Sequence, residues 1–361
     1  MLVELDKIIN VASNERVSDI HINKGEVWFR LNNKLVRRED LDYIDSQTKS
    51  VVEELIGEEL NNDIQLKDYN GSYFTGKSRF RVNIANTISG YNITMRLINE
   101  NPPTPESIGL PERLVTLSKE RKKGLILITG PTGSGKSTSL AALIDRLNEV
   151  GNKNIITLED PIEYVYKNKN SKIIQREIGR DTNSFEEGLS NILRQDPDVI
   201  LVGEMRTPES FLAALRAAET GHLVLSTMHT RSAAETITRI ADMFPDNTSM
   251  VLSMLSNSLI CILSQMLLER DEEHRKEDEP GMVLAYEYLE VNNKVANNIK
   301  ITEKSGTIKI NDIISHINGN EDRSISYTKV VTDLMNEYLI SEDLGRKLLE
   351  EFKEELKWEN G

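Results

Sequence analysis

The residues Gly130-Pro131-Thr132-Gly133-Ser134-Gly135-Lys136-Ser137-Thr138 contain a phosphate-binding loop pattern, whose eight positions run from Gly130 to Ser137. The glycines allow backbone N–H groups to curl around phosphate oxygens, where a side chain would block the approach. Lys136 is placed to contact the β and γ phosphates of ATP, and Ser137 to hold Mg²⁺. An ordinary glycine-rich turn between a strand and a helix is the alternative. The candidate cofactor-binding residues are therefore Thr132, Gly133, Ser134, Gly135, Lys136, Ser137 and Thr138.

Hydrolysis also needs a carboxylate, and two acidic groups follow strand-like runs. Glu204 comes after Gly203 and the apolar residues 199–202, at the strand end where an α/β sheet presents its ligand. It is the candidate to polarise the attacking water, while Gly203 stands where an Asp of the Mg²⁺ shell is usual. Glu163 is the second candidate, because it follows the strand-like residues 154–158. Helix capping or surface charge is the alternative for both glutamates.

Two of the five histidines bracket the apolar run 223–226. His229 falls at the exit of this predicted strand, on the ligand side, and is interpreted as a phosphate contact or a sensor of the γ phosphate. A structural role is the alternative for His229 and the favoured interpretation of His222. No third ligand stands at a spacing typical of a metal site, so the pattern disfavours metal binding by these histidines.

The elements that must position these residues alternate along the chain. Strand-like runs at 125–129, 154–158, 199–202 and 223–226 are interleaved with helical periods that start at Lys136 and Pro208. This alternation predicts an α/β sheet covered by helices. Beyond residue 241 the pattern is mostly helical, and the apolar window 251–268, with its serines, asparagine and glutamine, is predicted as a buried helix rather than a membrane span. The charged run 269–279 predicts a solvated loop.

The first hundred residues predict a small α+β domain. The pattern indicates a helix over 2–12, a strand over 19–23, a hairpin over 27–36 around Asn32-Asn33, a Ser-capped helix over 46–60, and a second hairpin over 79–98. Three prolines in residues 102–105 then mark a stiff linker. We expect an N-terminal domain over 1–98, a linker over 99–112 and a second domain over 113–361.

Composition excludes several classes of protein. The 361 residues carry 44 Lys plus Arg against 58 Asp plus Glu, a net charge of −14, which disfavours a duplex nucleic acid bound through a broad basic surface. A narrow basic channel inside an oligomer stays compatible with this charge. The single Cys261 excludes an intrachain disulfide and a Cys-x-x-Cys zinc site. No signal-peptide pattern is visible at the N-terminus, and we expect a cytosolic protein without direct membrane insertion.

Taken in order, the motifs resemble the secretion ATPase superfamily of type II secretion and type IV pilus machines, and within it the PilT-like pilus retraction (twitching motility) ATPases. The resemblance covers residues 1 to about 290. It rests on the signature over 193–206, the histidine box over 221–230, the acidic box over 156–163, the N-terminal segments 18–22 and 78–83, and the retraction-type segments 243–245 and 253–259.

The resemblance implies a RecA-like P-loop ATPase domain, a smaller PAS-like α+β N-terminal domain and a helical C-terminal tail. It also implies a homohexamer that hydrolyses ATP to power pilus retraction, working on an inner-membrane platform protein from the cytoplasmic side of the pilus base. Arg81 and Arg96 are the matching arginines that would reach the phosphates, and Arg194 the matching ligand-sensing arginine. Outward-facing charge on an exposed hairpin is the alternative for Arg81 and Arg96.

The chain departs from the family pattern in three places. Thr207 replaces the Asp that usually closes the signature, residues 295–300 lack both arginines of a motif that retraction ATPases carry there, and the tail beyond Ser305 matches only loosely. These departures keep alternatives open: an assembly or DNA-uptake pseudopilus ATPase of the same superfamily, a non-hydrolysing nucleotide-binding regulatory scaffold, or a nucleic-acid translocase. The missing zinc module speaks against assembly, and the net charge against translocation.

Overall fold

The computed structural model describes residues 3–15, 17–31, 34–58, 60, 68–76, 78–98, 101–276, 279–300, 308–319 and 323–359, without the side chains of residues 3 and 353–359. The chain divides into two compact units. The first comprises Met1–Asn101 with Pro161–Tyr166 and Gly179–Asp181, and the second comprises Pro102–Asp160, Lys167–Ile178 and Thr182–Gly361.

The first unit contains an antiparallel sheet in the order β3-β2-β1-β6-β5-β4. Alternation along the strands places one face of the sheet in a core: Ile20 and Ile22 are buried there, whereas His21 between them is half-exposed. Helices α1 and α2 contribute the rest of this core, whose fully buried members lie between Leu5 and Met95. The elements are α1 (Val3–Asn14), β1 (Asp19–Asn23), β2 (Glu26–Leu31), β3 (Lys34–Arg37), α2 (Thr48–Ile56), β4 (Asp68–Phe74), β5 (Arg79–Thr87) and β6 (Gly90–Ile98).

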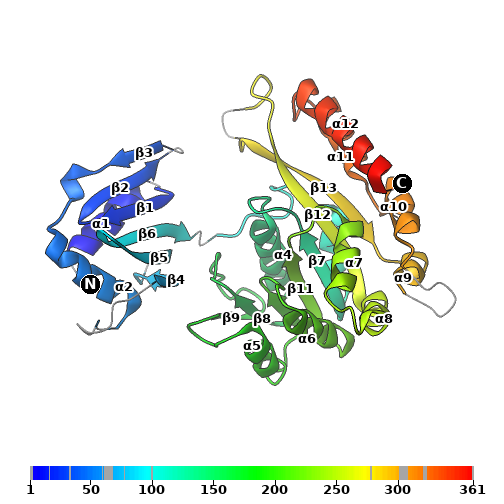
Figure 1. The fold of residues 1–361 in the computed structure, drawn as a ribbon, viewed down its shortest axis with the longest axis horizontal. Helices are drawn as coiled ribbons and strands as arrows, with labels where there is room; N and C mark the ends of the chain where they lie inside the picture. Colours follow the sequence, from blue (N-terminus) through cyan, green and yellow to red (C-terminus); the bar gives the residue numbers. More distant parts are fainter. Residues whose placement is uncertain are drawn as a thin grey trace. The chain divides into compact units, whose positions relative to one another are not determined.

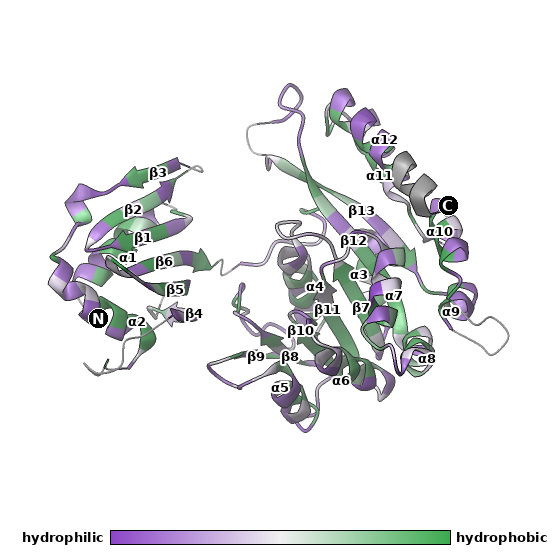
Figure 2. Ribbon diagram, viewed as in Figure 1, coloured by the Kyte–Doolittle hydropathy of each residue, from purple (hydrophilic) through white to green (hydrophobic). Residues whose placement is uncertain are grey.

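The second unit is built on a seven-stranded sheet in the order β13-β12-β7-β11-β10-β8-β9, with β13 antiparallel to β12 and the other neighbours parallel. Its strands are β7 (Gly124–Thr129), β8 (Asn154–Glu159), β9 (Lys172–Glu177), β10 (Val199–Val202), β11 (Leu223–Met228), β12 (Leu259–Glu269) and β13 (Met282–Glu290). The middle strands β7, β10 and β11 are buried at every residue, and Figure 2 shows them as hydrophobic. Continuous apolar runs of this kind are typical of a parallel sheet covered on both faces.

Helices cover this sheet, and the chain ends in the helices that follow β13 (Figure 1). A separate group, α11 and α12, packs on the outer part of β12 and β13 through its own apolar cluster. Within the described residues, no helix is both long and apolar enough to cross a bilayer. The helices are α3 (Glu112–Glu120), α4 (Lys136–Val150), α5 (Phe185–Ile192), α6 (Pro208–Glu219), α7 (Ala233–Asp242), α8 (Thr248–Ser258), α9 (Asn293–Ile299), α10 (Ile310–Asn318), α11 (Tyr327–Asn336) and α12 (Glu342–Glu359).

The α/β fold is confirmed, and several local predictions are corrected. The window 251–268 is not one buried helix, because α8 ends at Ser258 and β12 starts at Leu259. A short apolar run cannot be assigned to helix or strand from periodicity alone, and the same ambiguity hid both β12 and β13 in a region predicted as mostly helical. The predicted Ser46 cap is also wrong, since α2 starts at Thr48 after Gln47. The turn at Asn32-Asn33 lies outside the described residues.

Candidate nucleotide site

The phosphate-binding loop joins β7 to α4 at the carboxyl edge of the sheet. Gly130, Gly133 and Gly135 have φ angles of 146°, 83° and 85°, in the region that favours glycine. A Cβ at Gly130 would lie 2.2 Å from the carbonyl oxygen of Gln265, whereas a Cβ at Gly133 would meet no atom of the described residues within 4 Å. The loop is therefore closely packed at Gly130 and open at Gly133, as a phosphate cradle requires.

A buried glutamine on β12 supports this loop through hydrogen bonds. The Gln265 side-chain amide donates to the Ser134 carbonyl at 2.6 Å, and its Oε1 accepts from the Ser139 hydroxyl at 2.9 Å. One residue earlier on β12, the Ser264 hydroxyl lies 2.7 Å from that of Thr129 at the end of β7. Strand β12 thus holds the strand, the loop and the helix that make the cradle.

The first residues of α4 present the polar groups that the loop sequence predicted. Lys136 is 8% exposed, and its Nζ donates to the carbonyls of Gly130 at 2.8 Å and Pro131 at 3.0 Å. Ser137 is exposed and Thr138 is half-buried. Mg²⁺ is usually held by one or two protein oxygens together with substrate phosphates, and the exposed Ser137 hydroxyl beside the cradle fits that donor set.

A line of side chains runs from Lys136 to the predicted base. Lys136 Nζ lies 3.4 Å from His229 Nδ1, and His229 Nε2 lies 3.0 Å from Glu204 Oε1. Because an ammonium can only donate, Nδ1 accepts, and the neutral ring donates from Nε2 to Glu204. The other carboxylate oxygen of Glu204 contacts Arg206 at 2.8 Å, and this hydrogen bond raises the pKa of Arg206 above its ordinary value. The structure therefore brings Lys136, His229 and Glu204 together.

Backbone contacts between two strand ends position Glu204. The Met205 N–H donates to the Thr227 carbonyl at 3.3 Å, and the Thr227 hydroxyl donates to the Gly203 carbonyl at 2.7 Å. A Cβ at Gly203 would lie 3.3 Å from the Leu158 carbonyl oxygen, which is a tight contact with β8. This close approach favours glycine at the position where the Asp of a Mg²⁺ shell is usual, and the carboxylate follows one residue later.

Thr207, the first departure from the family pattern, serves as the N-cap of α6. Its hydroxyl accepts from the Ser210 N–H at 3.2 Å and donates to a Glu186 carboxylate oxygen at 3.1 Å. Thr can cap a helix as Asp does, so the substitution keeps the start of α6. In the second departure, Val295, Asn298 and Ile299 are buried on α9, and Lys300 is exposed.

The remaining predicted residues are not gathered around the loop within its own unit. Glu163 belongs to the segment that groups with the first unit, as do Arg81 and Arg96, so their roles stay predictions. Arg96 pairs with the buried Asp19 at 2.7 Å, and Arg81 is exposed beside it on β5. In the acidic box, the buried carboxylate is Glu159, which accepts from the Thr157 hydroxyl at 2.7 Å.

Arg194 lies at the opposite edge of the sheet from the loop. It is exposed and precedes the start of β10, and the next two carbonyls, of Gln195 and Asp196, accept from Asn154 at the start of β8. Within one chain, the structure does not bring Arg194 to Lys136. Any contact of this arginine with a nucleotide would have to be with that of another copy.

Sequence reasoning missed Gln265 and Arg206. Gln265 stood as a polar residue inside an apolar run, and a buried amide nearly always has hydrogen-bond partners, which was the available signal. Arg206 follows two residues after Glu204, and oppositely charged side chains at this spacing in a loop can form an ion pair. Neither partner could be named from the sequence, because Gln265 meets a loop that is 131 residues away.

Comparisons with known proteins find related sequences and a related fold. A family model described as type II/IV secretion system protein matches residues 2–353. The chain is 41% identical over 278 residues to the type IV pilus retraction ATPase PilT of Pseudomonas aeruginosa, covering 74% of this chain and 79% of that protein. It is 47% identical over 236 residues to a twitching motility protein of Neisseria gonorrhoeae, covering 64% and 61%. A crystal structure of the pilus retraction motor PilT with bound ADP superposes with a TM-score of 0.82 at 35% identity over 96% of each chain.

Proposed function

The chain belongs to the type II/IV secretion system protein family, and from that premise we propose that it hydrolyses ATP to power the retraction of type IV pili. The observation that carries the proposal is the line of contacts from Lys136 through His229 to Glu204. This line links a cation in the loop after β7 to a carboxylate after β10, through His229 at the end of the intervening strand β11. A phosphate-binding cation and a water-orienting carboxylate are the pair that hydrolysis of a phosphoanhydride requires.

The side chains divide the chemistry between them. Backbone N–H groups of the loop and Lys136 bind the phosphates, and the start of α4 adds its positive dipole end. Glu204 orients the attacking water, because each of its oxygens keeps a second lone-pair site beside the contacts with His229 and Arg206. His229 contacts both side chains and so fixes the position of Glu204 relative to Lys136. Mg²⁺ held by Ser137 and phosphate oxygens would stabilise the negative charge that develops on the leaving group.

The proposed motor is a homohexameric ring at the cytoplasmic face of the pilus base. ATP would lie where neighbouring chains of the ring meet, with Arg81 and Arg96 contributing charge to the phosphates and Glu163 a second carboxylate. Hydrolysis would rotate the N-terminal units against the ATPase units, and an inner-membrane platform protein would receive that motion. Support comes from the likeness to the retraction motor PilT.

The chemical half of the proposal is tested with purified protein. Lys136→Ala should abolish turnover by weakening phosphate binding, and Glu204→Gln should lower kcat by at least about 100-fold while ATP still binds. Glu209→Gln, which removes an exposed carboxylate five residues further on, is the matched control. Phosphate release at the normal rate by Glu204→Gln would refute the assignment of Glu204. A wild type that binds ATP but releases no phosphate would favour a regulatory scaffold.

The direction of the motor is tested in cells. A deletion strain should carry excess pili that extend and do not retract, and the wild-type gene should restore retraction while Glu204→Gln should not. A strain without pili would instead identify an assembly ATPase. The changed residues 295–300 make this comparison necessary, because they stand where the resemblance implies a motif needed for retraction.

A further inference from the structure

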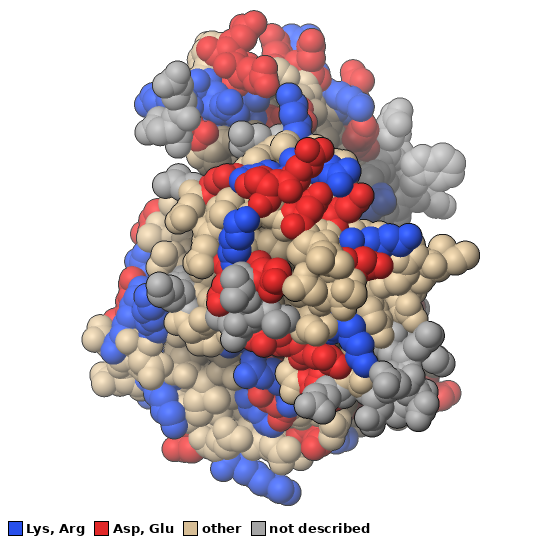
Figure 3. All heavy atoms as spheres, turned by 90° about the vertical axis from the view of Figure 1, so that its left-hand side faces the viewer, with Lys and Arg blue, Asp and Glu red and all other residues tan. Residues whose placement is uncertain are grey.

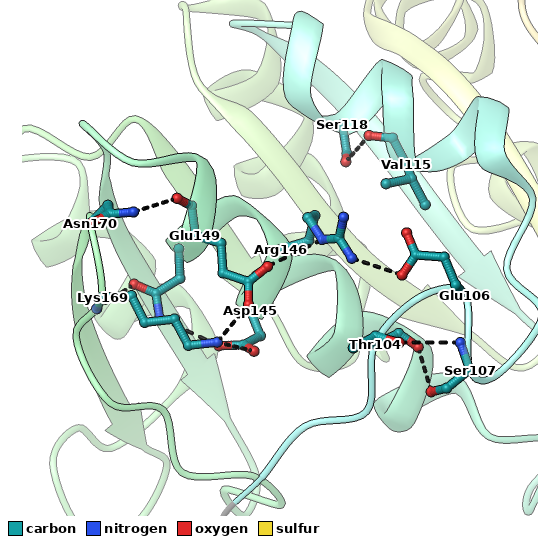
Figure 4. A network of polar contacts seen from close by, with 11 residues as sticks. Thr104, Glu106, Ser107, Val115, Ser118, Asp145, Arg146, Glu149, Lys169 and Asn170 are labelled. Carbon is teal, nitrogen blue, oxygen red and sulfur yellow. Dashed lines mark hydrogen bonds and ion pairs between the residues drawn. The ribbon is translucent and has the colours of Figure 1, made fainter.

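Helix α4 connects the phosphate-binding loop to two of the three places where the chain enters the ATPase unit. The helix starts at Lys136, and its last turns carry Asp145, Arg146 and Glu149 (Figure 4). The chain enters the unit three times, after Asn101, after Tyr166 and after Asp181, and α4 contacts the segments that follow the first two entries. In both cases the segment that follows an entry point is attached to the same end of α4.

The second entry segment is attached by a buried asparagine. Asn148 is 0% exposed; its Oδ1 accepts from the Lys169 N–H at 3.0 Å and its Nδ2 donates to the Lys167 carbonyl at 2.8 Å. The Asn148 carbonyl accepts from the Asn170 N–H at 3.1 Å, and the Asn170 amide donates to the Glu149 carbonyl at 2.7 Å. Both ends of a buried amide are thus used to fix the first residues after Tyr166.

Ion pairs extend the attachment to both segments. Lys169 Nζ lies 2.7 Å from Asp145 and 2.9 Å from Glu149. Burial lowers the pKa of Lys169, but its hydrogen bonds to the two carboxylates outweigh that effect and raise it above the ordinary value. On the other side, Arg146 donates to Glu106 at 2.7 Å, and Glu106 lies in a turn closed by bonds between Thr104 and Ser107 (Figure 4).

We propose that α4 is the coupling lever of the motor, with Asn148 and the Arg146–Glu106 pair as positioning residues that make both entry segments follow the nucleotide-binding loop. The proposal rests on the function proposed above. An α-helix of this length is a stiff rod, and about 15 Å separates the level of Lys136 from that of Arg146 along its axis. A shift of the loop on nucleotide exchange therefore moves the far end of α4, together with the segments attached there.

The test follows the two units of the full chain with paired spin labels. Ile88→Cys, at a fully exposed turn of the first unit, and Met250→Cys, on the exposed side of α8, carry the labels. Cys261 stays unlabelled because it is fully buried, and burial raises the pKa of its thiol to about 12. Labelled chains are mixed with an excess of unlabelled chains, and distances are measured with ADP and with a non-hydrolysable ATP analogue.

In the wild type we expect the distance distribution to differ between the two nucleotides. Glu106→Gln should shift the ratio of the two distributions by about two- to fivefold, the range for an exposed ion pair, while turnover stays within about twofold of the wild type. Arg146→Lys, which keeps the charge and leaves Glu106 in place, should retain most of the wild-type response. Asn148→Ala should reduce it further, provided that its melting temperature shows a folded protein.

The matched control is Lys329→Gln, which removes an ion pair with Asp333 on α11, away from both entry segments. It should leave the distances unchanged. A wild type that responds to nucleotide, with Glu106→Gln and a folded Asn148→Ala responding equally, would overturn the coupling role and leave the motor intact. A wild type whose distances ignore the nucleotide would overturn both.

Discussion

At the scale of single residues, His229 has the most consequential contacts. Its two ring nitrogens lie within reach of Lys136 and Glu204, so it relates the phosphate-binding cation to the water-orienting carboxylate. A histidine at a strand exit could have been structural, like His222, whose Nδ1 lies 3.0 Å from the Ala217 carbonyl. The difference between the two histidines lies in what surrounds them, which the sequence alone does not reveal.

Replacing His229 should therefore impair chemistry more than binding. We expect His229→Ala to lower kcat by up to about 100-fold, because Glu204 loses the contact that orients it. The ATP affinity should change much less, since the loop and Lys136 remain. Steady-state turnover and nucleotide titration separate the two effects, and a larger loss of affinity than of kcat would contradict this role.

Thr207 supports a prediction about stability and pH. The carboxylate of Glu186 accepts from its own backbone N–H and from the hydroxyls of Ser184 and Thr207, and these bonds outweigh burial and hold its pKa below the ordinary value. Such a lowered pKa stabilises the fold above the ordinary pKa of Glu, and that contribution is lost as the pH falls through the folded value. Thr207→Val should cost about 1 kcal/mol at neutral pH, chiefly through the lost cap.

Denaturant unfolding at several pH values checks this prediction. The difference in the free energy of unfolding between the wild type and Thr207→Val should become smaller in acid, as Glu186 becomes protonated. The part of this difference that is due to the cap should persist. A difference that grows toward low pH would contradict the sign. Thr207→Asp tests the same contact, because it keeps a capping oxygen but places a second carboxylate against Glu186.

At the scale of elements, two glycines of the loop form a matched pair. Gly130→Ala should destabilise the fold, because the new Cβ would overlap the Gln265 carbonyl at 2.2 Å. Gly133→Ala has open space and meets mainly the cost of its positive φ, of order 1–3 kcal/mol. Its main effect should be on ATP binding, where the methyl group occupies the cradle. Thermal unfolding without ADP should give Gly130→Ala the lower melting temperature of the two variants. Addition of ADP should raise the melting temperature less for Gly133→Ala than for Gly130→Ala.

The support that Gln265 on β12 gives to the loop leads to a different expectation for stability and ADP binding. Gln265→Leu removes the partner of the Ser134 carbonyl and the Ser139 hydroxyl, and each buried group left unpaired costs about 1–3 kcal/mol. We expect a lower melting temperature together with weaker ADP binding, because the loop loses its support. Calorimetry and ADP titration measure the two effects. Unchanged ADP affinity in a destabilised protein would limit Gln265 to a role in folding.

The elements show how far sequence reasoning reached. The strands at 125–129 and 199–202 and the helix from Lys136 were predictable, because continuous apolar runs, glycines and a known loop pattern are local signals. Strand β12 was not predictable, since Leu259-Ile260-Cys261-Ile262-Leu263 suits a buried helix equally well. The line from Lys136 to Glu204 was predictable only in outline: strand ends meet at one edge, but which atoms touch depends on packing.

At the scale of the whole molecule, the distribution of charge and the position of Arg194 bear on the proposed ring. Acidic and basic side chains are interspersed on the face shown in Figure 3, in keeping with a net charge of −14. Arg194 lies at the sheet edge opposite the loop of its own chain. A ring of identical subunits can place such a residue at the site of a neighbour.

Mixing two inactive variants tests this arrangement. Lys136→Ala lacks a working loop, and Arg194→Ala lacks the arginine, so each alone should be inactive. If Arg194 acts across subunits, an equal mixture should regain activity, because about a quarter of the sites in randomly mixed rings combine a wild-type loop with a wild-type arginine. Mixtures that stay inactive, in rings whose mass confirms exchange of subunits, would refute a role in trans.

The fully buried core of the first unit is drawn from residues between Leu5 and Met95, and this has a consequence for folding during synthesis on the ribosome. Ribosomes release a chain from its N-terminus at roughly 5–20 residues per second, so this unit can collapse while the ATPase unit is still being translated. For roughly tens of seconds its core would be complete while the rest of the chain, including the segments Pro161–Tyr166 and Gly179–Asp181 of the same unit, is still being synthesised. Early folding would shield its apolar strands from neighbouring nascent chains, and the sheet behind the phosphate-binding loop would close last, when β12 and β13 have emerged.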